Sequence, residues 1–117
     1  MKKLLCTALL ATLASAAVSA ATAFTDAKDA VDYRQSAFTL IRHNTGDIGE
    51  MLQGKVPFDA KRVQQRADAL AALAPLPWPA FSTPGTEAGG GEAKAEIWAD
   101  FKDFTAKADK FQLDAKA

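Results

Sequence analysis

Cysteine and histidine are almost absent from the chain, which contains one of each among 117 residues. They are Cys6 and His43. A disulfide needs two cysteines, a structural zinc site needs four ligands, mainly cysteine and histidine, and a catalytic triad needs a histidine beside its nucleophile. The triple glycine at 89–91 follows no predicted strand and lacks the spacing of a phosphate-binding loop. The sequence therefore shows no enzyme active site. His43, which lies between Arg42 and Asn44, is predicted to be a surface residue.

The first 23 residues have the organisation of a secretory signal peptide. Two lysines lie near its start, an apolar stretch follows, and the segment ends at Ala23 with Ala-Thr-Ala, a pattern of small residues typical of a signal-peptide cleavage site. The alternative is a membrane anchor, because the apolar stretch is about long enough to span a bilayer. Small residues dominate after Leu13 and no basic cluster follows, which favours the signal peptide. We predict cleavage after Ala23, with Ala20 or Ala21 left open, and a periplasmic protein without a membrane anchor.

An excess of positive charge is also absent. Basic and acidic residues both number 14, and two of the lysines lie in the predicted signal peptide. The exported part is therefore mildly acidic and has no basic cluster, which argues against nucleic acid or an anionic membrane as a partner. It also has no cysteine, because Cys6 lies in the signal peptide. A packed core, a ligand or a partner chain must stabilise it.

Three amphipathic helices are predicted, and no segment alternates as a strand does. The first spans about 26–52, with Thr25 or Asp26 as its N-cap and Gly54 as its stop. Its apolar residues recur at steps of three, four and seven, which places them on one helical face. They are Ala27, Val31, Phe38, Ile41, Ile48 and Leu52.

The second helix opens at Asp59 and ends before Pro75, and the third runs from about Ala95 to the end of the chain. A linker at about 75–94 joins them, and its residues 83–85 and 89–91 are predicted to be loop because of their proline and glycines. We predict an all-α fold of antiparallel four-helix-bundle type, with three helices in this chain and a single domain over 24–117. On the second helix, four polar residues are predicted to face water: Lys61, Arg62, Gln65 and Arg66.

Arg34 is a charged residue at a position that belongs to the apolar face of the first helix, one turn before Phe38. An unpaired charge buried in a core is costly. Two interpretations stay open. The stem of Arg34 packs on the core while its head reaches water, or the head meets an anion.

Aromatic residues are concentrated in the second half of the chain. Trp78 and Phe81 lie in the proline-rich linker, where they either cover the open end of the helices or form one wall of a cofactor pocket. The third helix carries an aromatic stripe of a kind that is usually plain core: Trp98, Phe101, Phe104 and Phe111.

Several segments resemble cytochrome c′ in their order and spacing, and together they cover essentially all of 24–117. They read DAVDYRQSA at 29–37, GKVPFDA at 54–60, LAPLPWPAF at 73–81, PGTE at 84–87 and EIWADF at 96–101. The resemblance implies a four-helix bundle that holds one c-type haem, usually as a homodimer packed through its first two helices. It also implies a role in electron transfer or in binding small gases such as NO, without naming a redox partner.

The resemblance assigns a role to each candidate site residue. Arg34 would meet a haem propionate, with Gln35 nearby. Phe38 would occupy an apolar distal face, which leaves the iron five-coordinate and open to uncharged gases such as NO. The pocket walls would come from Trp78, Phe104 and Phe111, with Glu92 near a polar haem contact.

One part of the family pattern is missing. The family attaches haem through Cys-x-x-Cys-His in its fourth helix, where the histidine is the proximal iron ligand, and this sequence has no such motif. We therefore predict no metal ligand within it and expect the chain to be a fragment, which sequencing the gene past Ala117 would test. Two alternatives stay open: a haem-free periplasmic interaction or stress protein, and a bundle that holds haem without covalent bonds through His43 or Met51.

Overall fold

The computed structural model describes residues 24–88 and 91–117, so the predicted signal peptide lies outside the described residues. Every regular element in those two ranges is helical, which confirms the all-α prediction. The elements are α1 (Ala27–Leu52), α2 (Ala60–Leu73), the 3₁₀ helices η1 (Trp78–Phe81) and η2 (Thr86–Ala88), α3 (Glu96–Ala99) and α4 (Phe101–Lys116). None of these helices combines the length and the apolar character that crossing a bilayer requires.

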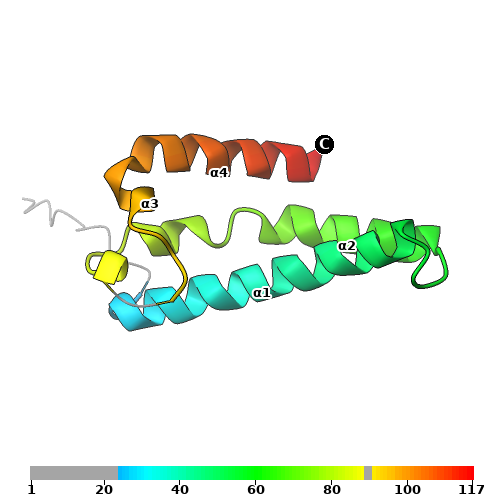
Figure 1. Ribbon diagram of the computed structural model, residues 1–117, viewed down its shortest axis with the longest axis horizontal. Coiled ribbons are helices and arrows are strands. Elements are labelled where there is room, and N and C mark those ends of the chain that lie inside the picture. The colour runs from blue at the N-terminus through cyan, green and yellow to red at the C-terminus, as the bar shows by residue number, and fades with distance from the viewer. Residues whose placement is uncertain (1–23, 89–90) are drawn as a thin grey trace, which may run out of the picture.

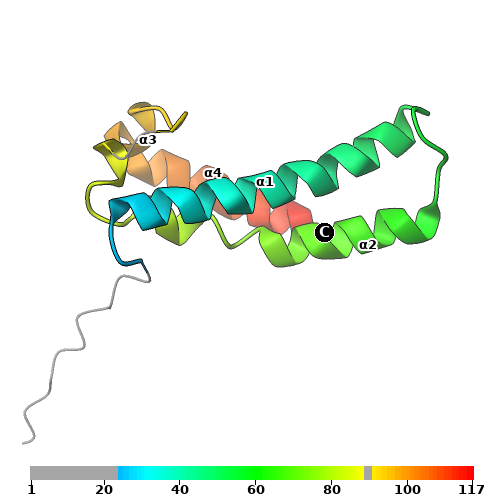
Figure 2. The same ribbon diagram turned by 90° about the horizontal axis from the view of Figure 1, so that it is seen from below.

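The helices α1 and α2 form an antiparallel hairpin, and α4 lies alongside it (Figure 1). The short elements η1, η2 and α3 gather at the end of the hairpin where α1 begins. At the opposite end the hairpin extends past the last turn of α4 (Figure 2). Two of the three longest helices therefore pack closely, while α4 contacts α2 and leaves an open side toward α1.

An N-terminal cap and one buried face define α1. The side chain of Asp26 accepts a hydrogen bond from the backbone N–H of Asp29 at 2.8 Å, which fixes the start of the helix as predicted. The buried face differs in part from the predicted one. Phe38 is 38 % exposed because it looks toward the open side, and Leu52 is 70 % exposed because it ends α1 at the tip of the hairpin. The buried residues of α1 are Ala30, Val31, Arg34, Ala37, Ile41 and Met51.

Asp59 caps α2 in the same way, since its side chain accepts a hydrogen bond from the backbone N–H of Arg62 at 3.1 Å. We expect Asp59→Ala to lower the free energy of unfolding by about 1 kcal/mol, because the first turn of α2 loses the acceptor of a backbone donor. Urea denaturation followed by circular dichroism measures this change. Asp59→Asn is the matched control, because asparagine caps equally well; an equal loss in both variants would contradict the capping role.

Within the linker at 75–94, residues 83–85 were predicted to be loop, and they form a bend and a turn. On either side of them lie η1 and η2, which the sequence did not predict. Proline fixes φ near the helical value and needs no N–H donor in a first turn, so Pro79 suits the start of η1. The linker is also packed: Phe81 is 4 % exposed and Thr86 1 %. The linker is therefore a structured and packed part of the fold.

The third predicted helix is divided into α3 and α4, which makes four α-helices rather than three in the described ranges. The break is at Asp100, whose backbone leaves the helical region with φ −131° and ψ 69°. Its side chain accepts a hydrogen bond from the backbone N–H of Asp103 at 3.1 Å. Aspartate competes for nearby backbone N–H groups and so favours a cap over a helix interior. The single turn of α3 thus sets the direction from which α4 starts.

Candidate functional site

Arg34 is the most unusual residue of the fold. It is only 3 % exposed, and its Nη1 has no hydrogen-bond partner among the described residues. The interpretation in which the head reaches water therefore does not hold. Burial lowers the pKa of the Arg34 guanidinium, and no carboxylate of residues 24–88 and 91–117 pairs with it. A buried donor and a buried charge are left without an acceptor, which is the arrangement expected where an anion binds.

Two aromatic rings hold the Arg34 guanidinium in place. Its central carbon lies 4.5 Å from the ring centre of Phe81 and 5.5 Å from that of Trp98. The indole N–H of Trp98 donates to the backbone carbonyl of Phe81 at 3.0 Å, so the two rings are also tied to each other. The faces of aromatic rings attract a cation but do not replace a hydrogen-bond acceptor. The rings therefore orient the guanidinium without supplying an acceptor to its Nη1.

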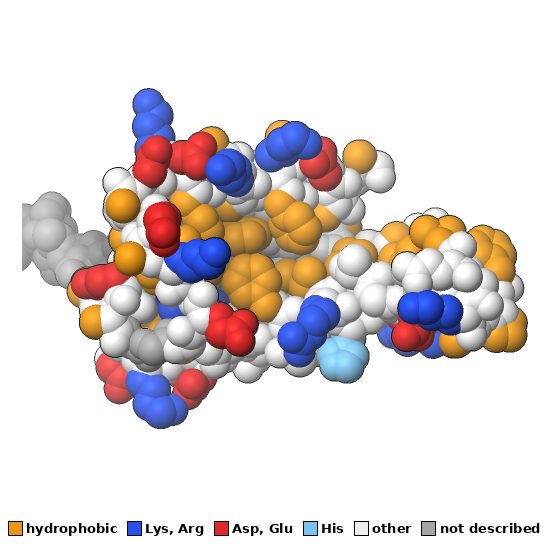
Figure 3. All heavy atoms as spheres, in the orientation of Figure 1, with side chains coloured by type: hydrophobic (Ala, Val, Ile, Leu, Met, Phe, Trp, Pro, Cys, Tyr) orange, Lys and Arg blue, Asp and Glu red, His pale blue; other side chains and the backbone are white. Residues whose placement is uncertain are grey.

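A cavity of about 990 Å³ lies beside Arg34. Figure 3 shows hydrophobic side chains gathered in the hollow between α1 and α4. Its volume is at the upper end of the roughly 300–1,000 Å³ of sites that hold small molecules and cofactors. The lining comes from α1, η1, the segment before α3, α3 and α4: Arg34, Gln35, Phe38, Thr39, Ile41, Arg42, Thr45, Gly46, Phe81, Glu92, Ala93, Ile97 and Phe104.

Five of the seven predicted site residues line this cavity: Arg34, Gln35, Phe38, Glu92 and Phe104. Trp78 and Phe111 are not among the lining residues, but they stand behind them. The ring of Trp78 lies 5.6 Å from that of Phe38, 5.8 Å from Phe104 and 5.9 Å from Phe111. Trp78 is fixed in turn, because its indole N–H donates to the carbonyl of Ala74 at 2.5 Å. These two residues support the wall that the others form.

The sequence did not decide whether Phe81 covers the open end of the helices or forms a wall of the pocket. Its ring lies 4.8 Å from that of Phe104, 6.1 Å from Trp98 and 6.2 Å from Phe38, in addition to its contact with Arg34. Of the two interpretations given for the linker aromatics, a pocket wall therefore describes Phe81, which lines the cavity. Its position in a proline-rich linker was the only signal in the sequence.

Gln35 lies beneath the backbone of Gly91. A Cβ atom at Gly91 would lie 2.6 Å from the side-chain nitrogen of Gln35, and the φ of Gly91 is +87°. The positive φ favours glycine at residue 91, and a Cβ atom there would also require the side chain of Gln35 to move. The contact brings the segment that carries Glu92 against α1, where Gln35 and Glu92 both line the cavity.

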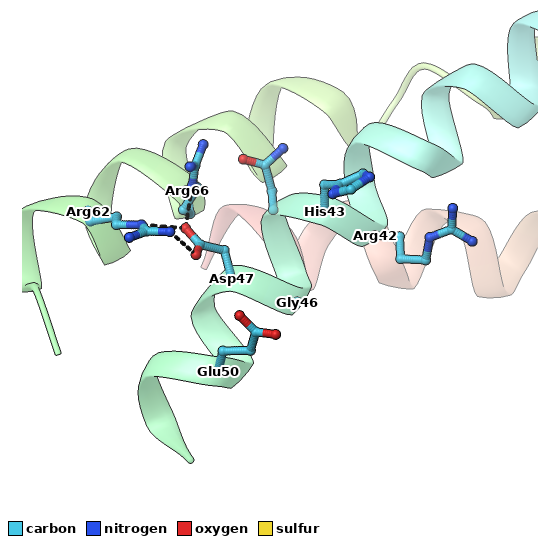
Figure 4. A pocket seen from close by; sticks show the side chains of 8 residues that line it. Arg42, His43, Gly46, Asp47, Glu50, Arg62 and Arg66 are labelled. Atoms are coloured by element: carbon cyan, nitrogen blue, oxygen red, sulfur yellow. Dashed lines mark hydrogen bonds and ion pairs between the residues drawn. The ribbon is translucent and has the colours of Figure 1, made fainter. Parts of the chain in front are cut away.

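A second, polar pocket of about 400 Å³ lies on the hairpin formed by α1 and α2. Figure 4 shows Arg62 and Arg66 reaching from α2 to the carboxylate of Asp47 on α1. Arg62 uses Nε and Nη2, with Nε 2.7 Å from the carboxylate, and Arg66 uses Nε at 2.6 Å. Arg62 is exposed as predicted and Arg66 is partly exposed, but both are also ion-paired with Asp47. The sequence did not predict this pairing, because it depends on how the two helices lie together.

Asp47 should make the stability of the hairpin depend on pH. Hydrogen bonds from Arg62 and Arg66 hold the pKa of Asp47 below its ordinary 3.8. The pair therefore stabilises the fold fully above that value, and the contribution is lost as the pH falls through the depressed pKa of the folded state. We expect the unfolding free energy of Asp47→Asn to fall less steeply below pH 4 than that of the native chain. Urea denaturation at each pH measures this, with Glu50→Gln in the same pocket as the control. Parallel pH curves for Asp47→Asn and the native chain would contradict the role of Asp47.

The two residues named as alternative iron ligands do not line the apolar cavity. His43 is exposed as predicted and borders the polar pocket (Figure 4), while Met51 is buried at 3 % exposure in the last turn of α1. Across the described ranges, no group of three or more His, Cys, Asp or Glu side chains could hold a metal ion. The geometry therefore gives no support to haem held through His43 or Met51.

Comparison with known proteins identifies the family to which this fold belongs. Residues 29–117 match the family model described as Cytochrome C'. The chain belongs to the cytochrome c′ family. It is 50 % identical over 84 residues to cytochrome c′ from Rubrivivax gelatinosus, which covers 71 % of this chain and 64 % of that protein. It is 43 % identical over 89 residues to cytochrome c′ from Alcaligenes xylosoxydans xylosoxydans, with 76 % and 68 % covered.

Solved structures of cytochrome c′ share the fold. The structure from Shewanella frigidimarina has a TM-score of 0.76 and 48 % identity, covering 80 % of this chain and 73 % of that one. The structure from R. gelatinosus has a TM-score of 0.73 and 46 % identity, with the same two shares covered. These structures confirm the predicted four-helix-bundle type. The chain spans about two thirds of the length of its curated relatives, 64 % in the case of R. gelatinosus.

Proposed function

We propose that the protein is a periplasmic haem-binding cytochrome of the c′ type, which transfers electrons or binds a small gas such as NO. The observation that carries the proposal is the buried Arg34 guanidinium, which lacks an acceptor and faces an aromatic cavity of cofactor size. A haem propionate is the anion that this arrangement fits, and the porphyrin face fits the ring-lined walls. Membership of the cytochrome c′ family supports the same assignment.

Each lining residue has a part in holding the cofactor. Arg34 would bind a propionate by a charge-assisted hydrogen bond, with Gln35 beside it. Phe38 and Phe104 would contact the porphyrin, and Trp78 and Phe111 would support them from behind. Glu92 would lie at the polar edge of the cavity. The printed sequence contains no Cys-x-x-Cys-His, so these residues define the surroundings of the haem and not its covalent attachment.

Phe38 decides which ligands the cavity favours. Haem c supplies an iron that exchanges electrons and binds NO where a coordination position is open. The side chain of Phe38 offers no hydrogen-bond donor to a ligand beside it, so its own contact favours small uncharged molecules over polar ones. One relative in this fold family, from Alcaligenes xylosoxidans, is described as a nitrosyl complex of a variant; it is 41 % identical, with a TM-score of 0.70, and covers 79 % of this chain and 71 % of that one. The proposal involves no covalent transformation of a substrate.

A homodimer packed through α1 and α2 is part of the proposal. Exposed apolar side chains on α1 support it, since Leu40 is 51 % exposed and Tyr33 39 %. Such side chains lose unfavourable contact with water when a second copy covers them. Sedimentation equilibrium of the native chain and of Leu40→Glu tests this part, because a charge in the interface should shift the dimer to the monomer.

Titration of the purified chain with haemin tests the cofactor assignment. The chain has two tryptophans, Trp78 and Trp98, and both belong to the aromatic cluster around the cavity. We expect one equivalent of haemin to quench their fluorescence and to shift the Soret band. Unchanged fluorescence and an unshifted Soret band at equimolar haemin would overturn the proposal and favour a haem-free periplasmic interaction protein on the same scaffold.

A further inference from the structure

We infer that the cavity also binds amphipathic carboxylates that contain neither iron nor porphyrin, with Arg34 as the anchor of the carboxylate. This inference extends the proposed function, since it uses the same cavity, but it does not depend on iron ligation. It concerns the class of molecule that the residues of this chain recognise. A monocarboxylate with an apolar chain, such as a medium-chain fatty acid, belongs to that class.

The first argument is that the anchor is already in place without a ligand. The Nη1 of Arg34 is buried and has no partner among the described residues. The guanidinium lies against the rings of both Phe81 and Trp98, and the hydrogen bond from Trp98 to the Phe81 carbonyl ties the two rings together. A side chain that is held in its binding conformation loses little freedom when the ligand arrives. Any carboxylate that reaches Arg34 therefore gains a charge-assisted hydrogen bond at low entropic cost.

The second argument concerns what else lines the cavity. Away from Arg34 the walls are mainly apolar, with Phe38, Ile41 and Phe104 among them, so an apolar chain is favoured there. Glu92 lines the same cavity and disfavours a second negative charge nearby. Arg42 is a second cation of the lining, but it is exposed to solvent and forms no ion pair within residues 24–88 and 91–117. A single carboxylate on an apolar body is the chemistry that satisfies this set of residues.

The test compares three probes of equal chain length on the haem-free chain: decanoate, 1-decanol and decyltrimethylammonium. Binding is followed by calorimetry and by the fluorescence of Trp98 and Trp78. We expect decanoate to bind about tenfold or more tighter than decanol, which corresponds to one charge-assisted hydrogen bond, and the ammonium to bind most weakly. We expect Arg34→Gln to abolish the preference for decanoate. Equal binding of decanoate and decanol by the native chain would overturn the inference.

Arg42→Gln is the matched control, because it removes an exposed arginine from the same cavity and the same helix. Its effect should be small and should vanish at high salt, whereas the preference due to the buried Arg34 should persist. A preference for decanoate that survives in Arg34→Gln contradicts the inference. If Arg34→Gln does not fold, nitrogen-15 NMR of the native chain decides, since the Arg34 side-chain signals should shift with decanoate and not with decanol.

The two proposals fail in different ways. Binding of decanoate together with no uptake of haemin would leave the carboxylate site standing and overturn the cytochrome assignment. Uptake of haemin together with equal binding of decanoate and decanol would leave the cytochrome assignment standing and overturn the carboxylate site. Loss of both would show that Arg34 has no anion-binding role.

Discussion

Replacing Phe81 by alanine is expected to lower the free energy of unfolding by about 3–5 kcal/mol, as found for large aromatic residues removed from a core. The side chain of Phe81 is 4 % exposed, and its ring contacts those of Trp78, Trp98 and Phe104. Its removal leaves a cavity that rigid neighbours cannot fill. A chain of this size has a total stability of about 5–15 kcal/mol, so the variant should be unfolded to a measurable extent.

Urea denaturation followed by tryptophan fluorescence and by circular dichroism measures the loss. Phe58→Ala is the matched control, because Phe58 is 63 % exposed at the start of the α2 segment, and its replacement should change the unfolding free energy by about 0.5 kcal/mol or less. Equal losses in the two variants would show that the linker aromatics do not form the core of this fold.

The contrast between α1 and the linker shows what sequence could predict. The ends of α1 and α2 were predicted closely because Asp26 and Asp59 cap them through hydrogen bonds three residues away. The position of Arg34 on the apolar face of α1 followed from its step along the same helix, although the sequence left open whether its head is buried. These features depend on neighbours within one or two turns, and local physical chemistry determines them.

The features that the sequence did not predict depend on neighbours far along the chain. Asp47 pairs with arginines 15 and 19 residues later, and this pairing exists only once α1 and α2 are docked. The apolar repeat of Ile97, Phe101 and Phe104 continues through Asp100, so periodicity alone predicts one helix where the cap of Asp100 makes two. The place of Phe81 likewise depends on how the linker folds over α1.

The same distinction applies to the candidate site. The resemblance to cytochrome c′ named residues that line the cavity, but it gave no reason for the conformation of Arg34. That reason lies in the two rings of Phe81 and Trp98, which come from the linker and from α3. Because neither ring is close to Arg34 in sequence, only the folded chain brings the anchor together.

Arg34→Met is expected to change the haem-free chain and the haem-bound chain in opposite directions. Methionine keeps much of the volume of the arginine stem and removes the charge. In the haem-free chain it removes a buried guanidinium that has no acceptor, so the free energy of unfolding should rise by about 1–3 kcal/mol. In the haem-bound chain it removes the propionate partner, so haem affinity should fall by about 1–3 kcal/mol, or roughly 5- to 150-fold.

Urea denaturation of the haem-free chain and the rate of haem transfer to an acceptor protein measure the two effects. Arg42→Met is the control, since Arg42 lines the cavity but is exposed, and neither quantity should change by more than about 0.5 kcal/mol. If Arg34→Met destabilises the haem-free chain and leaves the rate of haem release unchanged, Arg34 contributes only to packing. A rise in the unfolding free energy of the haem-free chain together with a fall in haem affinity would show that the buried charge of Arg34 destabilises the empty cavity and serves to bind an anion. Replacement of a residue that only packs would lower stability in both states.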